Sequence, residues 1–597
     1  MRKNGTTNVF KFEKKIEYDL NQRPKKMFLS AMDYASGLKS EKWIKNEYNS
    51  NGYLSKIIND SDNVTLWNIE KLNASGQLLS AFMTADRKTT NSYDEFGFPL
   101  QFKVDKLTTN LMTLDTEFDP IYGNLINRTS SNLFGTWTEN LTYDELDRLK
   151  NYNNTAGVQT QTYNDNGTIA SNNIGTYAYT ISNKPFQVST VTPLFPSAVY
   201  DYYNAREQNI TYNVFKSPVT ISELTKEKID FEYNSNNSRT AMYYGDMQPL
   251  KNNRSYRKYY SADGLMEIKY KLSAPSSIEF VTYIGGDAYS APLVLKSDGT
   301  TQEYLNLHRD YQGTINAITN SLGAVVEKRI FDVWGSLIQY ANNSGITIVP
   351  SNSTSMILDR GYTGHEHLLG VGLINMNGRI YDDKLHKFLQ PDNNIQDPYN
   401  TQNFNRYSYG LNNPTKFTDP SGESWVDVLG FLFSTYVHGA QATGEANPVK
   451  WNAGQFANAA MGAGSIIVSN YASTKVDTYV QNYGTTQDNA LNSVNYSNNS
   501  VENHEYVSSE SQYEGLQSNV SSFNGSSDVG NLATVGSLVG STSGLYAEQS
   551  FVKFYKSAPN GMFGVNYNGG YSYWSNNFKG GTRGNISSRF VNAAKNE

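Results

Sequence analysis

The chain contains no cysteine among its 597 residues, which excludes disulfide bridges and thiolate metal sites. Charged residues make up only 18% of the chain, the formal net charge is −6, and no long basic run is present. Such a surface lacks the electrostatic footprint that nucleic acid or an anionic membrane would attract. A polyanionic partner is therefore not expected. The compartment stays open, because a large β-protein can be extracellular without disulfides.

The amino terminus lacks the features of a secretory signal. Residues 1–15, MRKNGTTNVFKFEKK, hold neither an apolar core of roughly 7–15 residues nor a small-residue cleavage site. The sequence of these residues already resembles the repeats described below. We therefore expect the reading frame to be the C-terminal part of a larger repeat protein, or to be exported by a route that needs no cleaved signal.

The residues that are abundant favour β-structure. Tyrosine occurs 44 times, against 27 phenylalanines and 7 tryptophans, and Asn, Ser, Thr and Gly fill much of the rest. Tyr and Thr suit a pleated, half-buried surface, whereas Asn and Gly supply the turns between strands. A chain of this length holds several ordinary domains or one large repeat architecture. The composition predicts the second, mainly β, for the first two thirds.

A short motif recurs irregularly along the chain: an aromatic residue, then Asp or Asn, with Gly four positions after the aromatic. The copies that keep the glycine are Tyr48-Asn49 with Gly52, Tyr93-Asp94 with Gly97, Tyr163-Asn164 with Gly167, Tyr260 with Gly264 (where Ser261 takes the place of Asp or Asn), and Phe331-Asp332 with Gly335. Degenerate copies replace the glycine: Tyr18-Asp19 with Gln22, Tyr143-Asp144 with Asp147, and Tyr233-Asn234 with Asn237. Asn and Asp tolerate left-handed backbone angles best after Gly, so two of the three replacements still support a turn. Each copy predicts one hairpin, with a strand that ends at the aromatic residue and a tight turn after it.

Repeated hairpins need one another, because a single hairpin is marginal in water. Pairing edge to edge makes a continuous sheet, and its inherent twist lets a long sheet wind into a spiral that encloses space. The irregular spacing between copies argues against a propeller, whose blades recur at a fixed length. The residues alone do not distinguish a hollow shell from a β-solenoid.

Two longer stretches carry a family resemblance. Residues 308–338, HRDYQGTINAITNSLGAVVEKRIFDVWGSLI, precede residues 361–423, which begin GYTGHEHLLGVGLINMNGRIYDDKLHKFLQPD and end NNPTKFTDPSGE. With the repeats, they resemble the RHS/YD-repeat family and its RHS repeat-associated core, related to polymorphic toxins and to the C component of insecticidal toxin complexes. The resemblance covers residues 1–423. It implies a hollow β-shell that encloses a cytotoxic C-terminal segment and frees it by aspartyl-type self-cleavage.

The resemblance also implies a domain organisation and a set of site residues. Residues 1–300 would form the repeat shell, 301–423 the core, and 424–597 a variable cargo. Asp392 in FLQPD and Asp419 in TDPSG match the aspartates of the self-cleaving site, and Arg379 in NGRIYD matches its associated arginine. The expected cut lies between Glu423 and Ser424. No cofactor or metal is implied.

The chemistry of such a site is reasonable. Two nearby carboxylates do not ionise together easily, so one can hold a proton as general acid while the other activates water. A guanidinium beside them would fix their orientation. The alternative is that both aspartates only punctuate turns, since Asp-Pro-Ser-Gly is itself a turn sequence.

The chain departs from the family pattern at two positions near this site. The glycine of the usual GRF is His386, followed by Lys387 and Phe388, which bears on the turn that aims Asp392. The apolar residue usual after DPxG is Glu423, which places a charge beside the expected cut.

Other clusters are weaker. His365-Glu366-His367 offers two imidazoles at alternate positions without a third ligand at a recognisable spacing, and it is not HExxH, so a zinc site is not predicted. The glycine-rich run NGGYSYWSNNFKGG lacks the GK[ST] of a phosphate-binding loop and predicts hairpin turns.

After Glu423 the composition changes. Residues 425–484 predict apolar helices, 485–528 a polar linker and 529–597 a β-like tail, which together make a mixed α/β segment. Neither apolar stretch, 425–439 or 451–484, reaches the roughly 20 uninterrupted apolar residues that span a bilayer. Three hypotheses stay open: an enzymatic toxin, for which only the pair His504-Glu505 is available; a membrane-inserting segment around 456–470 and 529–547; and a soluble linker with a small β-domain.

The sequence thus predicts a secreted or surface-delivered RHS-type toxin protein that cleaves itself, with no recognised activity in its C-terminal region. Its partners would be its own C-terminal segment as enclosed cargo and an immunity protein encoded nearby. The alternative is an uncleaved cell-surface YD-repeat protein for adhesion or glycan binding.

Overall fold

The computed structural model describes residues 2–422 and 426–427, apart from 5–6, 50–51, 53, 74–76, 85, 96, 195–206, 236, 346, 348, 350–355, 394 and 398–399. Every regular element among them is a β-strand or a short 3-10 helix, and the strands form antiparallel sheets. The mainly β fold class is therefore confirmed. The mixed α/β segment expected after residue 423, its helices, linker and tail, and the pair His504-Glu505 lie outside the described residues.

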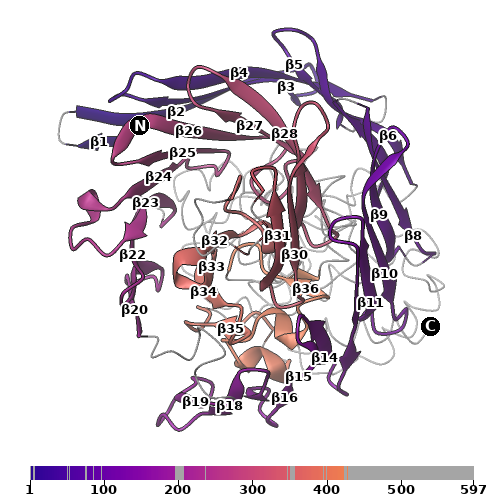
Figure 1. Ribbon diagram of the computed structural model, residues 1–597, viewed down its shortest axis with the longest axis vertical. Coiled ribbons are helices and arrows are strands. Elements are labelled where there is room, and N and C mark those ends of the chain that lie inside the picture. The colour runs from indigo at the N-terminus through magenta and orange to yellow at the C-terminus, as the bar shows by residue number, and fades with distance from the viewer. Residues whose placement is uncertain are drawn as a thin grey trace, which may run out of the picture. The chain divides into compact units, whose positions relative to one another are not determined.

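Two twelve-stranded sheets make up most of the described chain, and in both each strand pairs with the next strand in sequence (Figure 1). The first sheet contains β1 (Arg2–Asn4), β2 (Thr7–Tyr18), β3 (Pro24–Asp33), β4 (Lys39–Tyr48), β5 (Leu54–Asn59), β6 (Thr65–Leu72), β7 (Leu78–Met83), β8 (Arg87–Tyr93), β9 (Pro99–Lys106), β10 (Thr109–Phe118), β11 (Leu125–Ser131) and β12 (Thr136–Asn140). The second contains β20 (Gln208–Tyr212), β21 (Pro218–Glu223), β22 (Glu227–Tyr233), β23 (Arg239–Asp246), β24 (Tyr256–Tyr260), β25 (Met266–Lys271), β26 (Ala274–Ile284), β27 (Leu293–Ser297), β28 (Gln302–Arg309), β29 (Ile315–Thr319), β30 (Val325–Phe331) and β31 (Leu337–Asn342). The second sheet runs without a break across residue 301, and the domain boundary predicted there stays a prediction.

Smaller sheets connect and follow the large ones. Between them lie β13 (Thr142–Tyr143), β14 (Leu149–Asn154) and β15 (Gly157–Thr160), then β16 (Thr162–Tyr163), β17 (Ile169–Ser171), β18 (Gly175–Ala178) and β19 (Thr190–Pro193). After them come β32 (Glu366–Leu368), β33 (Leu373–Met376), β34 (Arg379–Asp382) and β35 (Lys387–Phe388), then the pair β36 (Phe417–Thr418) and β37 (Val426–Asp427). The 3-10 helices η2 (Lys251–Asn253), η4 (Tyr362–Gly364), η5 (Leu369–Val371), η6 (Thr401–Phe404) and η7 (Gly410–Asn412) complete the elements.

Each repeat motif forms the hairpin that the sequence predicts. Tyr93 ends β8, the Gly97 N–H donates to the Asp94 carbonyl at 3.1 Å, and β9 begins two residues later. The glycine has a positive φ, and so do the residues that replace it in degenerate copies: Gln22, Asp147 and Asn237. The turn therefore survives in all three, including the copy with glutamine, for which tolerance of left-handed angles was not expected.

The motif tyrosine explains why hairpins associate in order. The Tyr163 hydroxyl donates to the carbonyl of Leu149, the first residue of β14 in the preceding hairpin, at 2.7 Å. The same bond to the first residue of a return strand is made by Tyr48 to Pro24, Tyr93 to Leu78, Tyr143 to Leu125 and Tyr233 to Pro218. Each such bond contributes about 1 kcal/mol and ties one repeat to the one before it.

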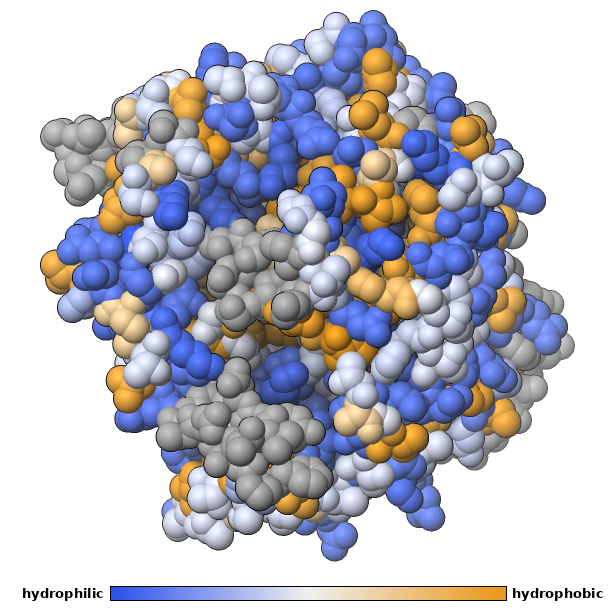
Figure 2. All heavy atoms as spheres, viewed as in Figure 1, coloured by the Kyte–Doolittle hydropathy of each residue, from blue (hydrophilic) through white to orange (hydrophobic). Residues whose placement is uncertain are grey.

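The two large sheets pack on each other in the same order. Ala31 of β3, near the beginning of the first sheet, shares a buried cluster with Ile268 of β25, in the middle of the second. Farther along, Leu114 of β10 shares one with Ala317 of β29. Later strands of the first sheet thus pack on later strands of the second, as successive turns of a spiral would. Figure 2 shows the visible outer face as mostly hydrophilic, with apolar residues scattered over it.

The sheet β32–β35 packs on the second large sheet. Leu373 and Ile380 join Ile229, Met242 and Tyr260 in one apolar cluster. This packing fixes β34, and hence Arg379 at its beginning, against the repeat strands. No helix in the described part of the chain is long and apolar enough to cross a bilayer.

Candidate functional site

Arg379, Asp392 and Asp419, which the sequence separates by up to forty positions, meet at one guanidinium. Arg379 Nη2 lies 3.0 Å from Asp392 Oδ2 and 2.7 Å from Asp419 Oδ2. Both Arg379 and Asp419 are buried, and the Asp392 side chain is 13% exposed. All three predicted residues therefore belong to one cluster, with one cation shared by two carboxylates.

The same guanidinium contacts the main chain just before the expected cut. Arg379 Nε donates to the carbonyl oxygen of Gly422, and Nη1 donates to that of Arg406 at 3.1 Å. The ring of Phe388 stacks against the guanidinium, 3.6 Å from its centre. With its donors engaged and one face covered, the Arg379 side chain is held in one orientation. Glu423 and Ser424, the residues of the expected cut, lie outside the described residues.

The Asp-Pro-Ser-Gly turn is fixed against the β33–β34 hairpin through its own main chain. The Gly378 N–H donates to the Ser421 carbonyl at 2.9 Å. Gly422 has a φ of +69°, and a Cβ there would lie 1.9 Å from the carbonyl oxygen of Met376. Only glycine fits that approach, so the turn is a built part of the site.

Two residues that sequence reasoning did not assign to the site also hold this turn. Asn377 Nδ2 donates to the Pro420 carbonyl at 2.9 Å, and His365 Nε2 lies 3.4 Å from the same oxygen. Burial and the nearby Arg360 lower the pKa of His365 to about 3, so its ring is neutral at pH 7. Asn377 stands in the Asn-Gly of MNGR, a turn signal, but nothing in the sequence indicated what that turn would contact.

The replacement of glycine by His386 leaves the turn before Asp392 intact. His386 has a φ of +57°, and β34 still pairs with β35 in register, Asp382 opposite Lys387. The imidazole stacks on Trp334 with ring centres 4.4 Å apart and lies 2.7 Å from Gln161 Oε1. These contacts offset the cost of left-handed backbone at a residue with a side chain.

The residues of the His365-Glu366-His367 cluster point to different partners. His365 Nδ1 lies 2.7 Å from Thr363 Oγ1, and His367 Nε2 accepts the N–H of Tyr362 at 3.1 Å. Glu366 faces the opposite way into a set of buried charges. No group of three or more potential metal ligands occurs within the residues that the structure describes.

That set of buried charges joins β32 to the repeat strands. Lys258 Nζ lies 2.8 Å from Glu267, 2.8 Å from Asp359 and 2.7 Å from Glu366, and Arg239 lies 2.6 Å from Glu366. Burial by itself lowers the pKa of Lys258, but its three carboxylate neighbours outweigh burial and raise it well above its ordinary value. Burial raises the pKa of Glu366, and Arg239 and Lys258 overcome this and lower it. This ionic cluster links elements that lie a hundred residues apart.

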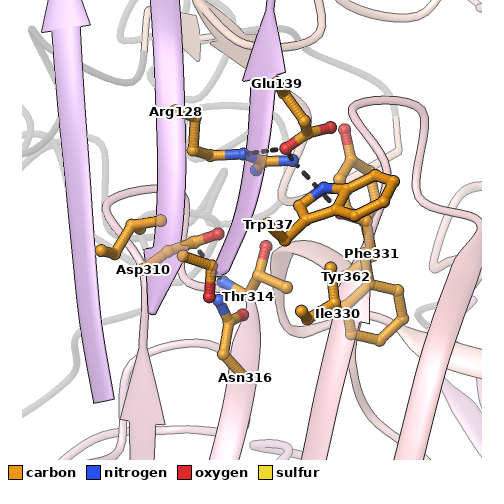
Figure 3. Close-up of a pocket in the computed structure, with 11 residues that line it drawn as sticks. Arg128, Trp137, Glu139, Asp310, Thr314, Asn316, Ile330, Phe331 and Tyr362 are labelled. Atoms are coloured by element: carbon orange, nitrogen blue, oxygen red, sulfur yellow. Dashed lines mark hydrogen bonds and ion pairs between the residues drawn. The ribbon is translucent and has the colours of Figure 1, made fainter. Parts of the chain in front are cut away.

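A second buried ion pair lies where the two large sheets meet (Figure 3). Arg128 Nη2 is 2.5 Å from Glu139 Oε2 and 3.2 Å from the Phe331 carbonyl, which it bonds. The polar cavity beside it measures about 10 Å³, room for about one water molecule. It is too small for an organic ligand, so this pair acts in packing.

Comparison with known proteins places the fold. No family model matches the chain. Among curated proteins, it is 30% identical over 225 residues to salivary gland surface protein 1 of Aedes aegypti, and 25% identical over 182 residues to tRNA nuclease WapA of Bacillus subtilis. Those alignments cover 34% and 30% of this chain, but only 6% and 7% of the two relatives.

Solved structures of TcdB2-TccC3 give the broader match. The complex without the hypervariable C-terminal region aligns over 70% of this chain with a TM-score of 0.52 and 16% identity, and the complex named TcdB2-TccC3-Cdc42 over 72% with 0.51 and 16%. This chain covers 23% and 24% of those chains. TccC3 is an RHS/YD-repeat protein, so the RHS-type fold expected from the sequence is confirmed.

Proposed function

We propose that this chain contains an RHS-type toxin shell that cleaves itself between Glu423 and Ser424 and thereby frees residues 424–597 as an enclosed effector. The observation that carries the proposal is the Arg379 guanidinium, which binds Asp392, Asp419 and the Gly422 carbonyl together. In the proposed reaction, one carboxyl group activates water and the other protonates the leaving nitrogen as the peptide C–N bond between Glu423 and Ser424 breaks. Export to the outside or to the cell surface belongs to the same proposal.

Three features support a hydrolytic role over plain turn chemistry. A turn needs neither a buried Asp419 nor a shared guanidinium, and burying one cation with two carboxylates gains little stability because desolvation offsets the attraction between the charges. The polypeptide beside the cut is anchored at three successive carbonyls, those of Pro420, Ser421 and Gly422. Such anchoring holds a peptide bond in one position relative to the catalytic groups. A fixed position of this kind lowers the entropic part of the reaction barrier.

The test is intact mass and N-terminal sequencing of the purified chain under denaturing conditions, so that a fragment retained by the shell separates. The parent is expected to give a new terminus at Ser424, and Asp392→Asn and Asp419→Asn to stay at the full 66.8 kDa. Asp383→Asn, in the same core but paired with Lys384 at 3.4 Å, is the matched control and should cleave like the parent. An uncut parent, or cleavage that persists in both site variants, would refute the proposal.

A second candidate is an uncleaved surface protein that binds glycans or neighbouring cells. The similarity to a relative named as a salivary gland surface protein favours it. It predicts one intact chain in all four preparations, so the same experiment separates the two functions.

A further inference from the structure

A cavity of about 430 Å³ opens beside the segment that carries Asp392. Its wall comes from three parts of the chain: residues 183–187 between β18 and β19, Tyr212 with Lys216, and the core residues 389–391 with Phe404, Arg406 and Tyr407. The volume lies in the range of small-molecule sites, which usually measure about 300–1,000 Å³. Unlike the cavity of Figure 3, it has room for an organic ligand.

The charge of this wall is positive. Lys184, Lys216 and Arg406 line the cavity, and no carboxylate is among the described residues that line it. Within the described part of the chain, none of the three cations lies within ion-pair distance of an Asp or Glu. Arg406 is held in place because Nη1 donates to the Asp392 carbonyl at 2.9 Å. The wall therefore presents positive charge without an internal counterion, which suits an anionic group.

The remaining surface of the wall is aromatic. Phe186, Tyr212, Phe404 and Tyr407 contribute rings. Tyr212 is 38% exposed and Phe404 is 42% exposed, although both are large rings that chains usually bury. Exposed rings around a concave surface favour a flat apolar partner, because stacking removes both faces from water.

We propose that this cavity binds a small organic anion with a flat apolar body, such as an aromatic carboxylate or sulfonate. The lysines and Arg406 face the anionic group, and the rings of Tyr212 and Phe404 cover the apolar body. The site is separate from the proposed hydrolytic cluster, and binding does not require that the chain cleaves. Arg406 nevertheless connects the two, since its carbonyl oxygen accepts from both Arg379 Nη1 and the Asp392 N–H.

The test is a fluorescence titration of the full chain with 8-anilinonaphthalene-1-sulfonate, an aromatic anion, and with its uncharged analogue N-phenyl-1-naphthylamine. The parent should bind the anion saturably at one site. The double variant Lys184→Glu/Lys216→Glu should weaken anion binding by roughly tenfold or more and leave the neutral probe within about twofold. The matched control, Lys71→Glu/Lys150→Glu, makes the same change of net charge at two exposed lysines outside the wall.

A third variant locates the binding. Phe404→Ala removes an exposed ring, so the fold should survive, and it should weaken both probes. If the parent does not bind the anion saturably, the proposal is overturned. Equal weakening by the two double variants would overturn it too, because net charge alone would then explain it. Unchanged binding of both probes to Phe404→Ala would also overturn it, because the probe would then sit elsewhere.

Discussion

Replacing Lys258 with methionine should destabilise the protein strongly, because Lys258 is the central cation of the ionic cluster that joins β32 to the repeat strands. Its side chain is 1% exposed, and its ammonium nitrogen lies 2.7–2.8 Å from Glu267, Asp359 and Glu366. Methionine has an unbranched side chain one heavy atom shorter than that of lysine, so the change removes the charged end and little other volume.

The expected cost follows from these contacts. Two unit charges 4 Å apart interact by about 4 kcal/mol at the effective dielectric of a protein interior, and three carboxylates lose such a partner at once. The desolvation that lysine no longer suffers offsets part of the loss. Removing one member of a buried ionic group typically costs about 3–5 kcal/mol, and we expect Lys258→Met to fall in that range.

The pH dependence of the free energy of unfolding distinguishes the loss of this charge from a simple packing defect. In the parent, the pKa values of Glu366 and Asp359 are lowered in the folded state, so their contribution is present above the ordinary carboxylate pKa and is lost as pH falls through the lowered values. Without Lys258, burial and like charges raise at least one of these pKa values above that of the unfolded chain. The variant should therefore recover stability as pH falls from 7 to 5, and its difference from the parent should narrow.

The assay is urea unfolding followed by tryptophan fluorescence at pH 7 and pH 5. The matched control is Lys296→Met, which removes a lysine 2.9 Å from Glu279 in a pair that is 22% and 34% exposed. A partly exposed pair contributes at most about 1 kcal/mol. Equal effects of the two substitutions at pH 7, or a deficit in Lys258→Met that grows as pH falls, would refute the reasoning.

Three further predictions concern the site and the repeats. Gly422→Ala should abolish or strongly slow self-cleavage, since its Cβ would lie 1.9 Å from the Met376 carbonyl oxygen; the fragment yield on a denaturing gel measures this, and normal cleavage would show that the turn is not fixed. Asn377→Gly, which keeps the left-handed backbone at φ +68°, should slow cleavage because the hydrogen bond to the Pro420 carbonyl is lost; a time course of intact mass tests it, and an unaltered rate counts against a positioning role. Tyr163→Phe should cost about 1 kcal/mol by leaving the Leu149 carbonyl without its donor; urea unfolding measures it, and no loss would mean that the hydroxyl ladder does not stabilise the repeats.

The local rules of the repeats were readable from the chain. An aromatic residue, an Asp and a Gly at fixed offsets predict a hairpin, since the positive φ at the fourth position needs glycine or a substitute with a tolerable strain. Gln22 shows the limit of that reasoning: its backbone has a φ of +60°, although glutamine has no intrinsic preference for it. The hydrogen bonds of the surrounding sheet impose the turn there. A prediction from residue type and local spacing does not include such a constraint from the rest of the fold.

The site likewise contains residues that the sequence identified and residues that only the structure shows. Arg379, Asp392 and Asp419 could be named from the family resemblance of the core sequence. Asn377 and His365 could not, because their contact with Pro420 depends on how the turn folds back on the β33–β34 hairpin. The sequence also could not show that the turn at His386 stays intact. That turn is supported by stacking of His386 on Trp334, a residue far away in the sequence.

By itself, the sequence determined the β-structure, the hairpin at each motif and the identity of the three site residues, because these depend on residue type and spacing over a few positions. The tertiary structure alone decided that the two large sheets pack in the same order, that one guanidinium gathers two carboxylates and the Gly422 carbonyl, and that cations and rings line a cavity beside Asp392. The physical reason is that burial and charge pairing are set by chain segments tens to hundreds of residues apart, and no local pattern records which of them meet.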